Sequence, residues 1–384
     1  MKDVTILIPC YNEARFIEKA ILSAVSQAEY VLISDNNSTD GTQEICRELA
    51  TQHSNVIFFE QKKNIGVMKN LEFLLSKTRT KYVMHVGAHD FISENYVFTL
   101  KESLENNSHA VLSYAPYFSI NDDGKILEEN LLDECSEKLI SKSSSQRVLS
   151  FIENRDFIFT FFGLIKTQIF RKYYSSKAVA GMDSLILSQI ISEGSFVRVS
   201  STHYYRRVIA RHNSGEAYMK RLEGDTTKPT QYDLSYMCTN QFKLLKEINK
   251  DNLEEQKKVL IRATMSMQRL YGKYCHKSLD ITLEKLSKSK EKYILYGAGT
   301  TSDYILEKLP NSILFIVDQD LTKQNTSKNG IEIKSPTILN QYENKIIISL
   351  LGRFELISEI LINEYKINSL RFILPIDYKY KISS

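Results

Sequence analysis

Short apolar runs and longer helical patterns alternate along the first third of the chain. The apolar runs are typical of strands that are buried on both faces, and they cover 4–8, 30–34, 55–60 and 81–86. Between them, apolar residues recur at the spacing of amphipathic helices over 16–25, 42–52 and 66–78. This alternation predicts an α/β domain whose mostly parallel sheet is flanked by helices. Because ligands bind at the carboxyl ends of parallel strands, the loops that follow these strands form the candidate site.

The rest of the chain shows three further patterns. Up to about 215, the pattern predicts strands at 110–115 and 195–200 and helices at 146–154, 166–174 and 183–193. Residues 232–288 are polar and helical in pattern. Further on, strands predicted at 292–296, 313–317, 346–350 and 372–374 alternate with helices that end at 309 and cover 354–365. We therefore expect a main domain at 1–220, a helical connector at 221–288 and a second, small α/β domain at 289–384.

Composition restricts the classes of protein that fit. The chain has 384 residues, of which 42% are hydrophobic and 25% charged, as in ordinary globular proteins. The net charge of +4 permits anionic partners such as nucleotide diphosphates or lipid headgroups and does not call for nucleic acid. Five cysteines without a CxxC pair argue against a disulfide framework or zinc cluster and favour a reducing compartment. Since we see no leader peptide and no apolar run of membrane-spanning length, we expect a cytoplasmic protein, with the inner face of the membrane as an alternative location.

Polar loops follow the first two predicted strands, with PCYNE at 9–13 and SDNNSTDGT at 34–42. Both lie at the same edge of the predicted sheet, so they should be neighbours. The Asp35 carboxylate can accept a hydrogen bond from the edge of a nucleobase, and Asn36 can supplement it. The alternative is a turn with a helix cap, which we prefer for Ser38, Thr39 and Gly41. A turn needs no acid at position 35, so we assign Asp35 to the site.

The loops after the third and fourth strands carry further candidate groups. Asn64 and Gly66, with Asn70 one turn into the next helix, could approach a phosphate or ribose at a helix N-terminus. An ordinary strand-to-helix turn explains them equally well. GAHD at 87–90 ends in Asp90, a carboxylate that can bind a divalent metal bridging a diphosphate, and His89 is a second potential ligand.

The four loops together resemble the motifs of glycosyltransferase family 2, which has the GT-A fold. The counterparts in chain order are IPCYNE (8–13), DNNSTDGT (35–42), NIG (64–66) and GAHD (87–90). The resemblance covers 3–215 and implies inverting transfer of a sugar from a nucleotide-sugar, with Mn²⁺ or Mg²⁺ as the cofactor.

The same resemblance implies roles for individual residues. The nucleoside pocket would be lined by Pro9, Tyr11, Glu13 and Asp35. Asp90 would correspond to the metal-binding acid, and His89 to a residue that contacts ribose or assists the metal. The chain departs from the family pattern at Gly87 and His89, where acids are common.

A general base is also implied by the resemblance. Asp183, which opens the helix predicted at 183–193, matches the acid that takes the proton of the acceptor hydroxyl. Taken alone, Asp183 would be interpreted as a helix cap. Phe157–Phe162 could stack on a sugar ring, and a core strand is the alternative.

Two basic segments further along, at 203–207 and 211–214, resemble another conserved stretch of the family. In that comparison Arg206 and Arg211 could contact the diphosphate, and His212 could complete the metal shell. A solvated basic loop is the alternative for each arginine.

The second α/β domain begins with a glycine-rich loop, GAGTTS at 297–302. Gly297 and Gly299 allow the backbone to approach a diphosphate, and Asp318 could receive a ribose hydroxyl. The domain resembles the Rossmann-type modules of sugar-modifying enzymes. We favour a structural, regulatory or partner-docking use over hydride transfer, because no second set of catalytic residues accompanies the loop.

The function expected from these observations is that of an inverting glycosyltransferase. It would move a sugar from a nucleotide-diphosphate sugar, with a UDP-sugar favoured, to a saccharide or lipid-linked saccharide. The setting would be bacterial surface polysaccharide synthesis, of capsule, lipooligosaccharide or O-antigen. One alternative is a non-catalytic sugar-nucleotide binding or scaffolding protein, motivated by Gly87 and His89. Another is an NAD-dependent oxidoreductase built on the C-terminal domain.

Overall fold

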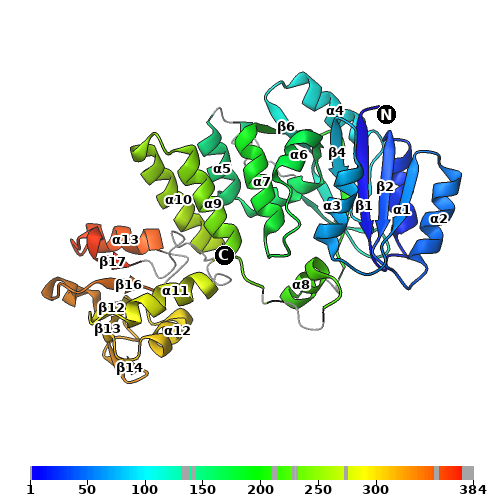
Figure 1. Cartoon of the computed structure of the whole chain (residues 1–384). Coiled ribbons are helices and arrows are strands. Elements are labelled where there is room, and N and C mark those ends of the chain that lie inside the picture. Colours follow the sequence, from blue (N-terminus) through cyan, green and yellow to red (C-terminus); the bar gives the residue numbers. More distant parts are fainter. Residues whose placement is uncertain are drawn as a thin grey trace. The chain divides into compact units, whose positions relative to one another are not determined.

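The computed structural model describes residues 2–130, 139–140, 143–209, 214–226, 230, 232–271, 276–349 and 354–373. The chain folds as two compact units (Figure 1). The first unit comprises Met1–Tyr232 with Glu247–Asp251, and the second comprises Asp233–Lys246 with Asn252–Ser384. The boundaries expected at 220 and 288 stay predictions.

The first unit is built on a seven-stranded sheet with the order β10-β6-β9-β4-β1-β2-β3. Its strands are β1 (Val4–Cys10), β2 (Tyr30–Asp35), β3 (Val56–Glu60), β4 (Tyr82–His85), β6 (Ala110–Tyr114), β9 (Leu164–Lys166) and β10 (Ser195–Arg198). The neighbouring pairs are parallel except those of β9, which runs antiparallel to β4 and β6. Every residue of β1 is buried, as its continuous apolar run predicts for a central strand. The mostly parallel α/β architecture is therefore confirmed.

Helices flank this sheet, and their apolar stripes explain where they pack. In α1, the buried residues Ile17, Ala20, Ile21 and Ala24 recur at intervals of three and four. The helix α3 packs on β1 and β2. The helices of this unit are α1 (Ile17–Val25), α2 (Thr42–Gln52), α3 (Val67–Lys77), α4 (Tyr96–Asn106), α5 (Ser144–Glu153), α6 (Thr167–Tyr173), α7 (Met182–Glu193) and α8 (Gly215–Glu223). The strand considered for 157–162 is wrong, because η2 (Arg155–Phe162) is a 3₁₀ helix.

A second, smaller sheet completes the first unit. Its order is β5-β11-β7-β8, with β5 (Phe91–Ile92), β11 (Tyr204–Arg207), β7 (Tyr117–Ile120) and β8 (Ile126–Asn130). The central strand β11 runs parallel to β7 and antiparallel to β5. This pairing brings β11 beside the segment that follows GAHD, and so positions the site described below.

The second unit joins helices to another α/β sheet. The expected helical stretch is confirmed by α9 (Ser235–Ile248), α10 (Leu253–Tyr271) and α11 (His276–Ser287). The sheet has the order β14-β15-β13-β12-β16-β17. Its elements are β12 (Tyr293–Tyr296), α12 (Thr300–Lys308), β13 (Ile313–Val317), β14 (Thr326–Lys328), β15 (Ile331–Lys334), η5 (Pro336–Gln341), β16 (Ile346–Ile348), α13 (Phe354–Asn363), η6 (Ser369–Arg371) and β17 (Phe372–Ile373). All pairs are parallel except β14 with β15, as the alternating pattern predicts.

Candidate functional site

A cavity of about 820 Å³ lies at the carboxyl ends of β1, β2 and β4, bordered by α3, η2, α7 and α8. It gathers most of the residues that the sequence singles out. Those that line it are Pro9, Tyr11, Glu13, Asn36, Asn64, Asn70, His89, Asp90 and Asp183. The four predicted loops and the predicted base therefore meet in one place.

The predicted acid Asp35 does not line this cavity. Its side chain is 0% exposed, and its Oδ1 accepts hydrogen bonds from the Ser38 backbone N–H (2.8 Å) and Gln43 Nε2 (2.7 Å). Its Oδ2 accepts the Ser38 hydroxyl. The carboxylate thus organises the turn after β2, and direct contact between Asp35 and a nucleobase stays a prediction.

Side-chain amides bind the loop between β3 and α3 to the sheet. We call this loop, residues 61–66, the donor loop. Asn36 Nδ2 donates to Asn64 Oδ1 (2.6 Å), and the Ile65 N–H donates to Asn36 Oδ1 (3.0 Å). Asn70 is buried, and its Nδ2 donates to the Ser34 carbonyl (2.8 Å). By contrast, Tyr11 is 43% exposed at the cavity wall, so its ring is accessible to a ligand.

His89 lies between two acids. Its Nδ1 is 3.1 Å from Glu13 Oε1, and its Nε2 is 3.9 Å from Asp90 Oδ1. Burial lowers the pKa of His89, but Asp90 and Glu13 outweigh it and hold this pKa above its ordinary value. Both ring nitrogens therefore face carboxylates, which favours the protonated imidazole.

Asp90 is 2% exposed and is hydrogen-bonded to the small sheet. The Tyr204 hydroxyl donates to Oδ2 (2.9 Å), and the Arg207 backbone N–H donates to Oδ1 (2.7 Å). The same tyrosine oxygen accepts the Gly87 N–H (3.0 Å), and Arg207 Nε donates to the His89 carbonyl (3.0 Å). A Cβ at Gly87 would lie 2.4 Å from Asp90 Oδ2, so a side chain there would require the Asp90 carboxylate to move.

These contacts test whether the expected divalent metal fits Asp90. Each carboxylate oxygen of Asp90 accepts one protein hydrogen bond and keeps a second lone pair. Within the described ranges, no three His, Cys, Asp or Glu side chains are grouped so that they could hold a metal ion. His212 and Arg211 lie outside the described residues. Among the described side chains, Asp90 is therefore not part of a complete protein set of metal ligands, and the expected divalent metal stays a prediction.

The wall of the cavity also combines an acid with aromatic rings. Burial raises the pKa of Asp183, whose Oδ1 accepts the Ser184 N–H (2.9 Å) in the first turn of α7. The ring centroids of Phe161 and Phe162 each lie 5.7 Å from that of His85. Burial lowers the pKa of His85 to about 3. The imidazole of His85 is therefore neutral, in a wall suited to an uncharged ligand.

Two cations of α8 also line the cavity, and the sequence interpretation missed them. Lys220 and Arg221 are exposed on this helix, and the Arg221 guanidinium carbon is 5.5 Å from the centroid of the Tyr218 ring. The helix begins after Ser214, whose hydroxyl accepts the Ala217 N–H. The serine cap, followed by the buried pair Met219 and Leu222 at three-residue spacing, is the pattern that could have revealed it.

Arg206 and Arg207 are neighbours on β11 with different surroundings. The Arg206 guanidinium carbon lies 5.0 Å from the centroid of the Phe159 ring, and Arg206 does not line the cavity. Arg207 is buried, and its guanidinium carbon lies 4.3 Å from the centroid of the Phe16 ring. The diphosphate contact predicted for Arg206 is thus not supported by its position.

The glycine-rich loop of the second unit is closed by its own contacts. The Ala298 N–H donates to Asp318 Oδ2 (2.8 Å), and Lys328 Nζ donates to the carbonyls of Ala298 and Gly299 (3.0 Å each). Gly297 has φ 96°, a conformation that glycine adopts readily. The nucleotide site at Gly297, Gly299 and Asp318 stays a prediction.

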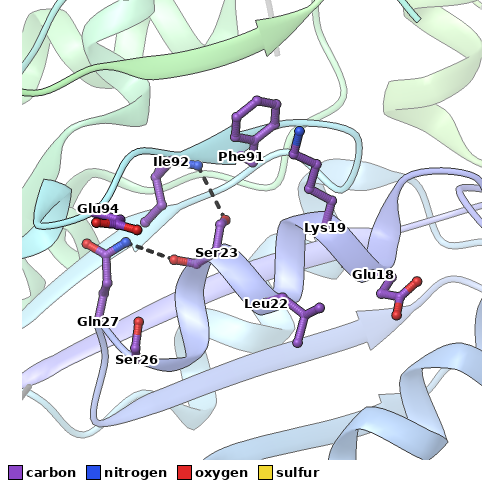
Figure 2. Close-up of a pocket in the computed structure, with 9 residues that line it drawn as sticks. All are labelled: Glu18, Lys19, Leu22, Ser23, Ser26, Gln27, Phe91, Ile92 and Glu94. Atoms are coloured by element: carbon purple, nitrogen blue, oxygen red, sulfur yellow. Dashed lines mark hydrogen bonds between the residues drawn. The ribbon is translucent and has the colours of Figure 1, made fainter. Parts of the chain in front are cut away.

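A shallower hollow of about 560 Å³ lies beside α1 and β5 (Figure 2). In it, Lys19 Nζ is 3.8 Å from the centroid of the Phe91 ring, which also stacks on Tyr205 at 4.4 Å. Gln27 Nε2 donates to the Ser23 carbonyl (2.8 Å). None of the residues predicted for the donor or catalytic site line this hollow.

Cys10, Cys46 and Cys238 are buried free thiols. Throughout the described ranges, every helix is too short or too polar to span a bilayer.

Tyr204→Phe should destabilise the protein by about 1–3 kcal/mol. It removes the hydroxyl that joins Asp90 Oδ2 to the Gly87 N–H, and so leaves two buried polar groups without that partner. Urea unfolding would measure the loss. Tyr205→Phe, on the same strand, is the control and should change the free energy of unfolding by less than about 0.5 kcal/mol. Equal losses in the two variants would contradict this role of Tyr204.

Comparison with known proteins finds glycosyltransferases similar to the N-terminal part of the chain. The family model for "Glycosyl transferase family 2" matches residues 5–173. The succinoglycan biosynthesis protein ExoA of Rhizobium meliloti is 35% identical over 25% of this chain and 31% of its own length. Glycosyltransferase GlyG of Streptococcus pneumoniae is 23% identical over 45% of this chain and 60% of its own length. The chain thus spans less than two thirds of the length of these curated relatives.

Solved structures give similar matches at low identity. TarS 1-349 of S. aureus, in complex with UDP-GlcNAc, is 16% identical with a TM-score of 0.44, over 70% of this chain and 81% of that one. The mannosyltransferase PcManGT of Pyrobaculum calidifontis, in complex with GDP-Man and Mn²⁺, is 15% identical with a TM-score of 0.45, over 69% of this chain and 74% of that one. The match to the model of glycosyltransferase family 2 covers less than half of the chain, and residues 5–173 are similar to that family.

Proposed function

We propose that the chain is an inverting glycosyltransferase that moves a sugar from a nucleotide-diphosphate sugar to an acceptor hydroxyl. The observation that carries this proposal is that Asp183 shares one cavity with the loops after β1, β2 and β4. An acid alone is a common helix-start residue. An acid that lines the same cavity of about 820 Å³ as the loops resembling family 2 motifs supports a role in the transfer between a bound donor and acceptor.

In the proposed step, the acceptor oxygen attacks the anomeric carbon on the face opposite the diphosphate. The bond from that carbon to the diphosphate oxygen breaks, the nucleotide diphosphate leaves, and Asp183 takes the acceptor proton. One oxygen of Asp183 holds the Ser184 N–H, which orients the carboxylate, and the other can accept the proton. The step as proposed uses no proton transfer by Asp90, whose oxygens accept hydrogen bonds from Tyr204 and Arg207.

The donor proposal rests on the polar wall of the cavity. Tyr11, Asn36 and Asn64 line it beside the loop that begins α3. These groups suit a nucleoside, with a UDP-sugar favoured. The neutral wall of His85, Phe161 and Phe162 suits a sugar ring, since aromatic faces bind apolar sugar faces.

The acceptor and the pathway are proposed by likeness. The relatives include proteins named for succinoglycan biosynthesis and for minor teichoic acid biosynthesis. We infer that the acceptor is a saccharide or lipid-linked saccharide of a bacterial surface polysaccharide, made in the cytoplasm or at the inner face of the membrane. Comparing the surface polysaccharide of a strain that lacks the protein with that of the parent strain would test this setting.

A second candidate function is non-catalytic binding of a sugar-nucleotide in a polysaccharide assembly complex. Gly87 and His89, together with the buried Asp90, favour it, because the acids that commonly bind a metal in family 2 are absent or engaged. The two functions differ in one measurable respect. Both bind a nucleotide-sugar, and only the transferase forms a glycosylated product.

Asp183→Asn should abolish turnover and leave donor binding within about threefold of wild type. The amide keeps the size and the hydrogen bond to Ser184 but accepts no proton, and loss of a general base typically costs about 10²–10⁴-fold. Product formation by mass spectrometry and UDP titration by calorimetry would measure the two effects. Asp156→Asn, an exposed acid at the start of η2, is the control. Full turnover by Asp183→Asn would remove this acid from the mechanism.

The pH profile of turnover should show the raised pKa of Asp183. Burial raises this pKa, and only the deprotonated carboxylate can take a proton, so kcat falls as the pH decreases through it. The decrease in kcat at acid pH should occur above the ordinary pKa of aspartate, which is about 3.9. A kcat that stays constant down to that ordinary range would contradict the assignment.

A further inference from the structure

The residues expected to meet a metal are engaged with the protein. Both oxygens of Asp90 accept hydrogen bonds from Tyr204 and Arg207. His89 has its two ring nitrogens toward Glu13 and Asp90. A side chain at position 87 would require the Asp90 carboxylate to move, because its Cβ would lie 2.4 Å from Asp90 Oδ2. Further positive charge for a donor diphosphate at this edge of the sheet can come from cations elsewhere on the cavity wall.

The helix α8 carries that charge. Lys220 and Arg221 line the cavity, and neither forms an ion pair with an acid in the part of the chain that the structure describes. The acids of the cavity have other partners: Glu13 pairs with His89, Asp90 bonds Tyr204 and Arg207, Asp183 bonds Ser184, and Asp225 bonds Asn64. The positive charge of Arg221 also reaches Asp183 and His85 in the wall of the cavity.

The end of α8 is fixed against the donor loop. The Asn64 N–H donates to Asp225 Oδ2 (3.3 Å), and the Asp225 N–H donates to the Asn64 carbonyl (3.1 Å). At Gly66, with φ 82°, a Cβ would lie 2.1 Å from the Leu222 carbonyl oxygen, so only glycine permits this approach. The backbone that carries Lys220 and Arg221 is therefore fixed beside the loop at 64–66, which the sequence predicts to approach a phosphate or ribose.

We propose that Lys220 and Arg221 bind the diphosphate of the nucleotide-sugar donor and neutralise the leaving group without a divalent metal. The inference rests on the proposed function and deepens it. A guanidinium presents paired N–H donors that match phosphate oxygens, and a lysine supplies a second compact charge. Both would stabilise the negative charge that develops on the departing diphosphate.

Calorimetric titration of chelator-treated full-length protein would test the proposal, with UDP, UMP and uridine as probes. We expect UDP to bind without metal, and addition of Mn²⁺ to change its Kd by less than about threefold. Lys220→Gln combined with Arg221→Gln should weaken UDP binding by at least about tenfold, because each charge-assisted hydrogen bond is worth about tenfold or more. Uridine binding should be unchanged in that variant. Lys69→Gln, an exposed cation on α3 that does not line the cavity, is the matched control and should bind UDP like wild type.

Two results would overturn the inference, and they separate it from the proposed function. UDP binding that requires Mn²⁺ and survives the double substitution would overturn the role of α8 and leave a metal-dependent transferase standing. Failure of UDP, and of GDP in a parallel titration, to bind with or without Mn²⁺ would overturn both proposals together. Circular dichroism of each variant would confirm that α8 and the sheet are intact.

Discussion

The buried carboxylate of Asp90 is the interaction on which the rest of the site depends. A buried charge is costly unless protein groups satisfy it, and here Tyr204 and Arg207 supply both hydrogen bonds. Through these bonds the loop after β4 is held against β11 of the small sheet. The Tyr204 hydroxyl also accepts a hydrogen bond from the Gly87 N–H. This one hydroxyl therefore binds both the first and the last residue of the GAHD turn.

The rest of the cavity follows from this anchor. His89, fixed beside Asp90, meets Glu13 at the end of β1, which joins two of the four loops. The acids at this edge are thereby used within the protein, and the lysine and arginine side chains that line the cavity, among the described residues, are Lys220 and Arg221 of α8. Asp183, His85 and two phenylalanines line the same cavity. Under the proposed function, the cations of α8 would meet the diphosphate, and the second group would meet the sugar and acceptor.

Local patterns were enough to predict much of the fold. The apolar runs of β1, β2, β3 and β4 are continuous in the sequence, and each is followed by turn-forming residues, so the strands and the loops at their ends could be read directly. The parallel sheet of the second unit was predicted for the same reason. The segment 157–162 was ambiguous, because a short aromatic run fits a strand, a 3₁₀ helix or a buried helix equally well.

The partners of individual side chains could not be predicted in the same way. Asp90 bonds Tyr204 and Arg207, which lie 114 and 117 residues away along the chain. Arg206 and Arg207 are adjacent on β11, and successive residues of a strand point to opposite faces, so only the register decides which one is buried with Asp90. The hydrogen bonds of Asp35 and Asp90 could not be predicted, because a sequence shows an acid without its hydrogen-bond partners. Lys220 and Arg221 were missed because their importance comes from the placement of α8 over the donor loop.

The most direct test of the account is a crystal structure of the protein grown with both UDP and Mn²⁺. The account predicts that UDP lies in the cavity, that its diphosphate contacts Arg221, and that Asp90 keeps its hydrogen bonds to Tyr204 and Arg207. A manganese ion bound to Asp90, with those hydrogen bonds broken, would contradict the central role given to this buried carboxylate. UDP bound outside the cavity would contradict the assignment of the site itself.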